Sequence, residues 1–267
     1  MLAADWITFP PHAHGMALQF DIRAWAACAP ALQTPADWQA WSQAPWLPAG
    51  TDLPALAAMA PMLRRRVNVT GRAALHPAYD IAAVDDATGT PKGIPAVFAS
   101  RHGDSHRAYE MLGELANGQP LSPTAFGLSV HNAIGAMFSI DRRDPSNMQA
   151  LSAGRDTAEN ALVEACALLE EGADEVLVVC YDTPLPDPYL DFADEPQCLF
   201  GWAWHIGRPD GRHPAFSLEI IEPDSLDAPR PPALLPHGLD VLRFVLTDEP
   251  MLLHRGESAA WRWQRHG

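Results

Sequence analysis

Residues 146–182, SNMQALSAGRDTAENALVEACALLEEGADEVLVVCYD, constrain the fold more than any other part of the chain. Their order predicts a short strand, a sharp turn at residues 152–156, a long helix and a second strand. Apolar residues recur along the helix at three- and four-residue spacing, and Gly172 is placed to end it. The nearly continuous apolar run EVLVVC is typical of a strand buried on both faces of a sheet.

The turn itself is the first candidate site, because many enzymes place a nucleophile between a strand and a helix. Ser152 is the only residue of this turn that could act as one. An activated serine needs a base within hydrogen-bond reach and donors for an oxyanion, so His102 or His131 would have to fold close to it. The GxSxG signature of the α/β-hydrolases is absent. Beyond the turn, we expect Asp156 to cap the helix with Glu159 as the reciprocal partner.

The rest of the chain alternates strands and helices around this stretch, which predicts a layered α/β/α fold with a mixed, mainly parallel central sheet. We expect one domain in three parts: an N-terminal strand with a Trp- and Pro-rich covering segment (1–60), the α/β core (61–207) and additional strands (208–267). Strands are expected at 18–24, 94–100, 198–207, 216–223 and 259–265, and helices at 38–42, 71–84, 105–116 and 121–140. Residues 239–246 fit either a strand or a short helix.

Composition excludes several kinds of partner. The formal net charge of −15 argues against nucleic acid and against anionic membranes, since both require a basic surface. No run approaches the ~18 apolar residues of a membrane span, and the N-terminus lacks the pattern of a signal peptide. Four widely spaced cysteines are typical of buried, reduced thiols. We therefore expect a cytoplasmic protein.

Other polar residues offer weak candidates. His12 and His14 have no third ligand at a sensible spacing, so we predict no metal, and no phosphate-binding glycine loop or other cofactor motif is present. The run His102 to His106 follows an expected strand and fits a surface loop better than a pocket. We interpret His131, in an apolar helix pattern, as a hydrogen-bonded core or interface residue. Lys92 is the only lysine, so any Schiff-base chemistry would depend on it.

The run LSPTAFGLSVHNAIGAMFSI, followed by the stretch described first, resembles the N-terminal half of the β-ketoacyl synthases of the thiolase superfamily. Counting back from Gly172 places the nucleophilic cysteine of that family on Gly154, with Ala153 just before it. No cysteine lies nearby, and residues 183–267 are too few for the second half that carries the family's two histidines. The resemblance thus implies a single half-thiolase domain with a degenerate catalytic position.

The runs LSAGRDT and FADEP are similar to those of short, chain-length-factor-type subunits of aryl polyene and xanthomonadin-type pigment pathways. The resemblance implies a silent subunit that pairs with a full-length β-ketoacyl synthase and shapes the tunnel for an acyl chain carried by acyl carrier protein. It also implies contact residues. We expect an interface strand of Asn147, Met148, Gln149, Ala150 and Leu151, and tunnel-lining side chains from Tyr109, Leu112 and Leu115.

Alternatives to this role remain open. Tyr109, Leu112 and Leu115 fit an ordinary helix core as well as a tunnel. The chain as a whole could be an independent acyl-thioester enzyme that uses Ser152 or a displaced thiol. It could also be a non-catalytic homodimer that only recruits other proteins.

Overall fold

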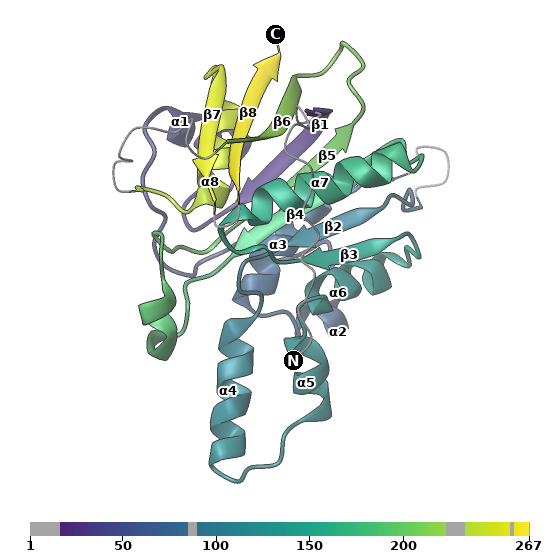
Figure 1. Cartoon of the computed structure of the whole chain (residues 1–267). Coiled ribbons are helices and arrows are strands. Elements are labelled where there is room, and N and C mark those ends of the chain that lie inside the picture. Colours follow the sequence, from purple (N-terminus) through teal and green to yellow (C-terminus); the bar gives the residue numbers. More distant parts are fainter. Residues whose placement is uncertain (1–16, 85–89, 223–232, 257–258, 267) are drawn as a thin grey trace, which may run out of the picture.

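One eight-stranded sheet runs through the computed structural model, which describes residues 17–84, 90–222, 233–256 and 259–266 (Figure 1). The strands lie in the order β3-β2-β4-β5-β1-β6-β8-β7. They comprise β1 (Leu18–Cys28), β2 (Ala96–Ala99), β3 (Met148–Leu151), β4 (Val176–Asp182), β5 (Phe200–Gly207), β6 (Ala215–Ile221), β7 (Met251–Arg255) and β8 (Ala260–His266).

Eight α-helices and two short 3₁₀ helices accompany the sheet within these ranges. They are α1 (Pro35–Gln43), α2 (Pro61–Arg64), α3 (Val69–Asp80), α4 (Ser105–Ala116), α5 (Pro123–Ser129), α6 (Ala133–Arg142), η1 (Gly154–Asp156), α7 (Thr157–Glu170), η2 (Asp187–Phe192) and α8 (His237–Leu246).

Helices cover both faces of the sheet, which confirms the layered α/β/α arrangement. Val178 in β4 packs into a cluster with α1, α7 and α8, whereas its neighbours Leu177 and Val179 pack with α3 and α6. Successive residues of a strand point to opposite faces, so β4 can contribute to both layers only if it is apolar throughout. All of Val176 to Tyr181 is buried. The interpretation of this run as a doubly buried strand is therefore confirmed.

The sheet is mixed, but the expectation that it is mainly parallel is wrong. β2 pairs in parallel with β3 and β4, and the other pairings within the described sheet are antiparallel. Parallel neighbours need a crossover, usually a helix, whereas antiparallel neighbours do not. The proline-rich segment between β4 and β5 holds only the short η2, so β5 returns antiparallel to β4. The first strand, β1, then pairs between β5 and β6.

Two local expectations also needed correction. Residues 121–140 form two helices, not one, because Val130 has an extended backbone and breaks the apolar pattern between α5 and α6. Residues 239–246 resolve to a helix, α8, and β7 lies where no strand was predicted. The other predicted strands and helices are present, with ends that shift by a few residues. Gly172, with φ of +112°, ends α7 as predicted.

Helices α4 and α5 form an arm that projects away from the body of the protein (Figure 1). Met111 is the only buried residue of α4, and α5 has none. Tyr109, Leu112 and Leu115 are 40%, 55% and 59% exposed. Their interpretation as an ordinary helix core is therefore wrong. Within the described residues, no helix is both long and apolar enough to cross a bilayer.

Candidate functional site at the strand-to-helix elbow

The elbow, residues 152–156, joins the end of β3 to α7 through the short helix η1. Gly154 has φ of +56°, a left-handed conformation that glycine adopts at low cost. The amide of Ala153 donates to Oγ1 of Thr157 at 3.1 Å, which helps close the turn. The strand, turn and helix predicted from the sequence are all present. The side chains at the turn therefore decide what this elbow can do.

Ser152 is hydrogen-bonded to the main chain. Its hydroxyl donates to the backbone oxygen of Arg101 at 2.8 Å, so its proton points at a carbonyl rather than at a base. In the described structure, neither His102 nor His131 is hydrogen-bonded to Ser152. A ring nitrogen of His131 bonds the backbone oxygen of Ser100 at 3.0 Å, and burial, followed by the charge of Arg101, lowers the pKa of His102. The interpretation of His131 as a hydrogen-bonded residue is confirmed.

The four cysteines do not supply a nucleophile to the elbow in its place. All of them are buried and free, as predicted. Burial is the main cause that raises the pKa of Cys28, Cys166 and Cys198 to about 12, and it also raises that of Cys180. Each sulfur therefore stays a neutral thiol near pH 7, whereas the thiolate is the reactive form.

A partly buried polar cluster lies at the ends of β2 and β4, next to the elbow. The side chain of Arg101 is 11% exposed and pairs with Asp194 at 2.9 Å and with Glu195 at 2.8 Å. Asp182, at the end of β4, accepts hydrogen bonds from the Ser100 hydroxyl at 2.8 Å and from the Arg101 amide at 3.0 Å. Burial outweighs these bonds and raises the pKa of Asp182 to about 7.

The cavity between Gly154, Arg101, Glu195 and His237 has a volume of only about 10 Å³. That is about the space that one water molecule requires. An acyl thioester cannot enter such a cavity unless Arg101 and Glu195 move apart.

Two histidines that sequence reasoning did not single out lie beneath the elbow. Nε2 of His237, at the start of α8, is 2.6 Å from Oε1 of Glu159. Nε2 of His254, in β7, is 3.0 Å from the backbone oxygen of Arg155 and 3.5 Å from Oδ1 of Asp156. His237 and His254 stack with ring centroids 3.3 Å apart and planes inclined by 12°. The two histidines, Glu159 and Asp156 are all buried.

Charge pairing sets the protonation of this cluster. Burial alone would lower the pKa of His237, but the charge of Glu159 and its hydrogen bond outweigh burial and raise that pKa. Burial likewise opposes ionisation of Glu159, but the charge and hydrogen bond of His237 lower its pKa. Trp263 adds a hydrogen bond to Oε1 of Glu159 at 2.9 Å. Each partner therefore favours the charged form of the other.

The predicted capping box is therefore wrong. Asp156 occupies the N-cap position of α7, but its side chain makes no capping bond, and it accepts a hydrogen bond from Trp261 at 3.2 Å. Glu159 points into the core and does not return to the cap. Trp261 binds the carboxylate of Asp156, and His237 and Trp263 bind that of Glu159. The spacing of residues along the helix cannot reveal partners from distant segments.

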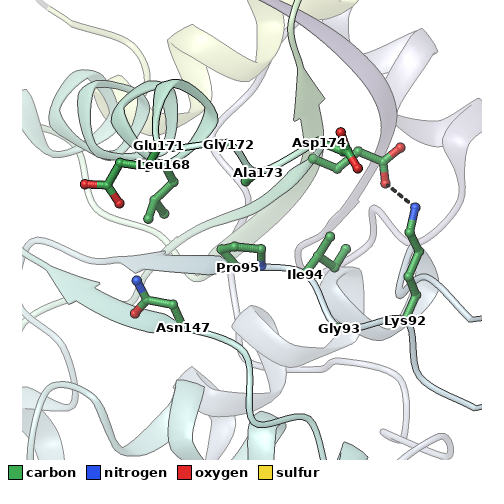
Figure 2. Close-up of a pocket in the computed structure, with 11 residues that line it drawn as sticks. Lys92, Gly93, Ile94, Pro95, Asn147, Leu168, Glu171, Gly172, Ala173 and Asp174 are labelled. Atoms are coloured by element: carbon green, nitrogen blue, oxygen red, sulfur yellow. Dashed lines mark hydrogen bonds and ion pairs between the residues drawn. The ribbon is translucent and has the colours of Figure 1, made fainter.

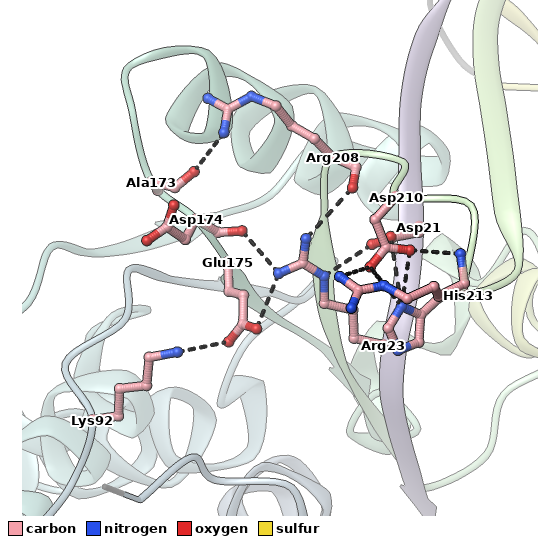
Figure 3. A network of polar contacts seen from close by, with 10 residues as sticks. Asp21, Arg23, Lys92, Ala173, Asp174, Glu175, Arg208, Asp210 and His213 are labelled. Carbon is pink, nitrogen blue, oxygen red and sulfur yellow. Dashed lines mark hydrogen bonds and ion pairs between the residues drawn. The ribbon is translucent and has the colours of Figure 1, made fainter.

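Glu159, His237 and His254 place one ligand atom each within 4.8 Å of the others, a donor set that zinc sites use. The stacking of the rings does not fit a shared ion, because lone pairs in two parallel planes do not converge on one point. A second cluster, Asp21, Asp210 and His213, is already neutralised by arginines (Figure 3). Arg23 contacts Asp21 at 3.2 Å, and Arg212 contacts Asp210 at 3.0 Å.

A larger cavity of about 430 Å³ lies at the other end of the parallel strands (Figure 2). Lys92, Asn147 and Glu171 are among its lining residues. Lys92 is 51% exposed and contacts Glu175 at 3.5 Å. A reactive lysine is typically desolvated, which Lys92 is not. The predicted histidine pair of the N-terminus, His12 and His14, lies outside the described residues.

This architecture is that of a ketosynthase-like protein. Residues 38–264 match the family model described as the β-ketoacyl synthase N-terminal domain, and the chain belongs to that family. The match extends beyond residues 61–207 on both sides. No curated protein sequence matches the chain significantly.

Solved structures give the same fold. The complex of the ketosynthase ApeO with its chain length factor ApeC from Xenorhabdus doucetiae contains a chain that matches with a TM-score of 0.77 and 28% identity, over 93% of this chain and 100% of that one. The ishigamide ketosynthase/chain length factor matches with a TM-score of 0.59 and 15% identity, over 76% of this chain and 65% of that one. A complex of a type II polyketide synthase acyl carrier protein with its ketosynthase (AntDE:AntF) matches with a TM-score of 0.58 and 12% identity. The match covers 77% of this chain and 70% of that one. The thiolase-like half-domain implied by the resemblance is thereby confirmed.

Proposed function

We propose that the chain is a catalytically silent, chain-length-factor-type subunit that pairs with a complete β-ketoacyl synthase in type II, aryl-polyene-like synthesis. The partner would perform the condensation on acyl chains carried by acyl carrier protein, in the cytoplasm. The observation that supports the lack of catalysis is at the elbow. Residues 152–155 contain no cysteine, and the Ser152 hydroxyl donates to a backbone carbonyl. The match to a ketosynthase and chain length factor complex supports the pairing.

Three features of the elbow agree with silence. The cavity of about 10 Å³ admits no substrate, and Arg101 is fixed there by two carboxylates. The buried histidines are bound to Glu159 and to the backbone of Arg155, so neither is placed against Ser152. By the count from Gly172, Gly154 takes the position of the family's nucleophile, and we keep that correspondence as part of the proposal. Ser152 and a displaced thiol are both disfavoured by the same geometry.

The interface would be the outer edge of β3, Asn147 to Leu151. β3 ends the sheet in the described structure, and such an edge offers unpaired backbone groups to another chain. Its residues are exposed or half-buried. The exposed side of α4, with Tyr109, Leu112 and Leu115, would face the acyl tunnel.

A reconstituted assay tests silence. The purified chain is incubated with malonyl- and acyl-acyl-carrier protein, alone and with a co-expressed ketosynthase, and condensation products are measured by mass spectrometry. We expect no product from the chain alone, and no change in the complex on Ser152→Ala. Installing a thiol by Ser152→Cys or Gly154→Cys should also give no activity, because the histidine that lines the same cavity, His237, is already bound to Glu159. Turnover by the pure chain that Ser152→Ala removes would overturn the proposal.

Product length tests the tunnel role. In the reconstituted complex, Leu112→Ala should lengthen the products and Leu112→Trp should shorten them, since the side chain sets the available depth. Leu234→Ala serves as a matched control, because Leu234 is 77% exposed and lies outside the arm. A stable homodimer without a ketosynthase partner would favour the scaffold alternative instead.

A further inference from the structure

The segment around η2 lies beside α4 and connects it to the elbow (Figure 1, green). Tyr189 of η2 meets Tyr109 of α4 edge to face, with ring centroids 5.8 Å apart. Tyr189 also contacts Phe192, with ring centroids 6.3 Å apart. Polar contacts of His106 and Arg107 hold the first turn of α4, and only Met111 of this helix is buried. Tyr189 is therefore one of the few contacts that could fix the position of Tyr109.

Hydrogen bonds hold the segment, although η2 itself buries no residue. At its beginning, a ring nitrogen of His106 lies 2.9 Å from the backbone oxygen of Pro184. The amide of Leu185, a buried residue, donates to Gln197 at 3.1 Å. Prolines at positions 184, 186 and 188 fix the backbone angle φ at alternate residues.

Its end lies against the elbow, where Asp194 is 3.6 Å from Arg155. Asp194 and Glu195 both pair with Arg101, and Glu195 also accepts a hydrogen bond from the amide of His237 at 3.0 Å. The same segment thus closes the elbow at one end and supports Tyr109 in its middle. The edge-to-face contact with Tyr189 therefore favours one orientation of the Tyr109 ring.

We propose that Tyr189 is a positioning residue for chain length: it holds the ring of Tyr109 at the tunnel, and so sets where the acyl chain must stop. This rests on the proposed function of the α4 surface. Tyr189 itself acts through Tyr109, so removal of either ring has the same consequence. The growing chain extends past the position that Tyr109 normally blocks.

The test compares product lengths from the reconstituted ketosynthase complex supplied with malonyl-acyl-carrier protein. Tyr189→Ala should shift the distribution by at least one two-carbon unit toward longer products, as Tyr109→Ala does. The double variant should add nothing to Tyr109→Ala alone, because both changes remove one interaction. Tyr189→Phe should restore the normal lengths, since it keeps the ring. Trp46→Ala, at an aromatic residue that is 45% exposed and outside this segment, is the control.

The outcomes separate the two ideas. If Tyr109→Ala lengthens products and Tyr189→Ala leaves them unchanged, Tyr189 has no positioning role. If neither tyrosine affects length, the tunnel role of α4 fails instead. If Tyr189→Ala does not form the complex, Tyr189→Leu keeps most of the volume without a flat ring. The same lengthening is expected there, and normal lengths with Leu at this position would overturn the inference.

Discussion

Nε2 of His237 lies 2.6 Å from Oε1 of Glu159, and this contact joins the first turn of α7 to the start of α8. The two residues are far apart in the sequence, and both are buried. Because the elbow precedes α7 directly, the pair ties the C-terminal part of the chain to the elbow.

Replacing Glu159 by glutamine should destabilise the fold strongly. The change keeps an oxygen that can accept from Trp263 but leaves buried His237 without its carboxylate, and breaking a buried pair typically costs about 3 kcal/mol or more. Urea unfolding followed by circular dichroism measures the loss. Glu170→Gln, at an exposed position of the same helix, is the matched control and should change stability little. Equal losses in the two variants would contradict a special role for the pair.

The pair should also make stability depend on pH. The folded pKa of His237 is raised, so its contribution is full below the unfolded value of about 6.5 and is lost as pH rises through the folded value. The folded pKa of Glu159 is lowered, so its contribution is present above about 4.3 and is lost as pH falls through the folded value.

The measured quantity should be the difference in unfolding free energy between the wild type and His237→Gln across pH 4 to 9. Asp182, whose pKa is raised to about 7, is present in both proteins, so its own titration largely cancels. We expect the difference to be greatest between about pH 4.3 and 6.5 and to shrink at higher pH. A difference that grows with rising pH would show that the imidazolium is not the stabilising form.

Gly256→Ala should lower the stability of the fold by disturbing the contact between Gly256, which follows β7, and the elbow. A Cβ at this position would lie 1.2 Å from Oδ1 of Asp156, so either the turn or the carboxylate must move. We expect a loss of about 1–3 kcal/mol, the usual cost of overpacking. Gly113→Ala in α4 is the opposite case. A Cβ there meets nothing within 4 Å, and alanine is the better helix former by about 1 kcal/mol. Thermal unfolding of both variants checks the contrast.

Ala150→Pro should weaken assembly with the ketosynthase while the fold is retained. Ala96 donates to the backbone oxygen of Asn147, and Ser100 donates to that of Leu151. Alternate residues of β3 therefore face β2, and the amide of Ala150 faces the open edge. Proline removes that donor. A pull-down with the co-expressed partner measures the effect, and Ala150→Ser keeps the amide as the control. Unchanged binding by Ala150→Pro would argue against strand pairing at this edge.

The central part of the fold could be predicted from the sequence, because its signals are local. The stripe of α7, the stop at Gly172 and the apolar run of β4 each occur within a short stretch, and all three are present. The direction of strand pairing could not be predicted in the same way. It depends on which strands meet after the chain has folded. β1, the first strand in the sequence, lies between β5 and β6 in the sheet.

The site was less predictable for the same reason. Glu159 has the spacing of a capping residue, and only the arrival of His237 and Trp263 from the C-terminal region shows why it turns inward. His254 lies in a strand whose pattern is too short to identify. The absence of a thiol from the elbow, by contrast, could be read directly from residues 152–155.

Lys92 gives the protein a practical property. It is the only lysine of the chain, it is half exposed, and it shares a cavity with Asn147 at the beginning of β3. Amine-reactive reagents therefore have one side-chain target, in the cavity that borders the strand expected to meet the partner. A fluorophore or short cross-linker attached there would report the arrival of a second subunit without any engineered cysteine.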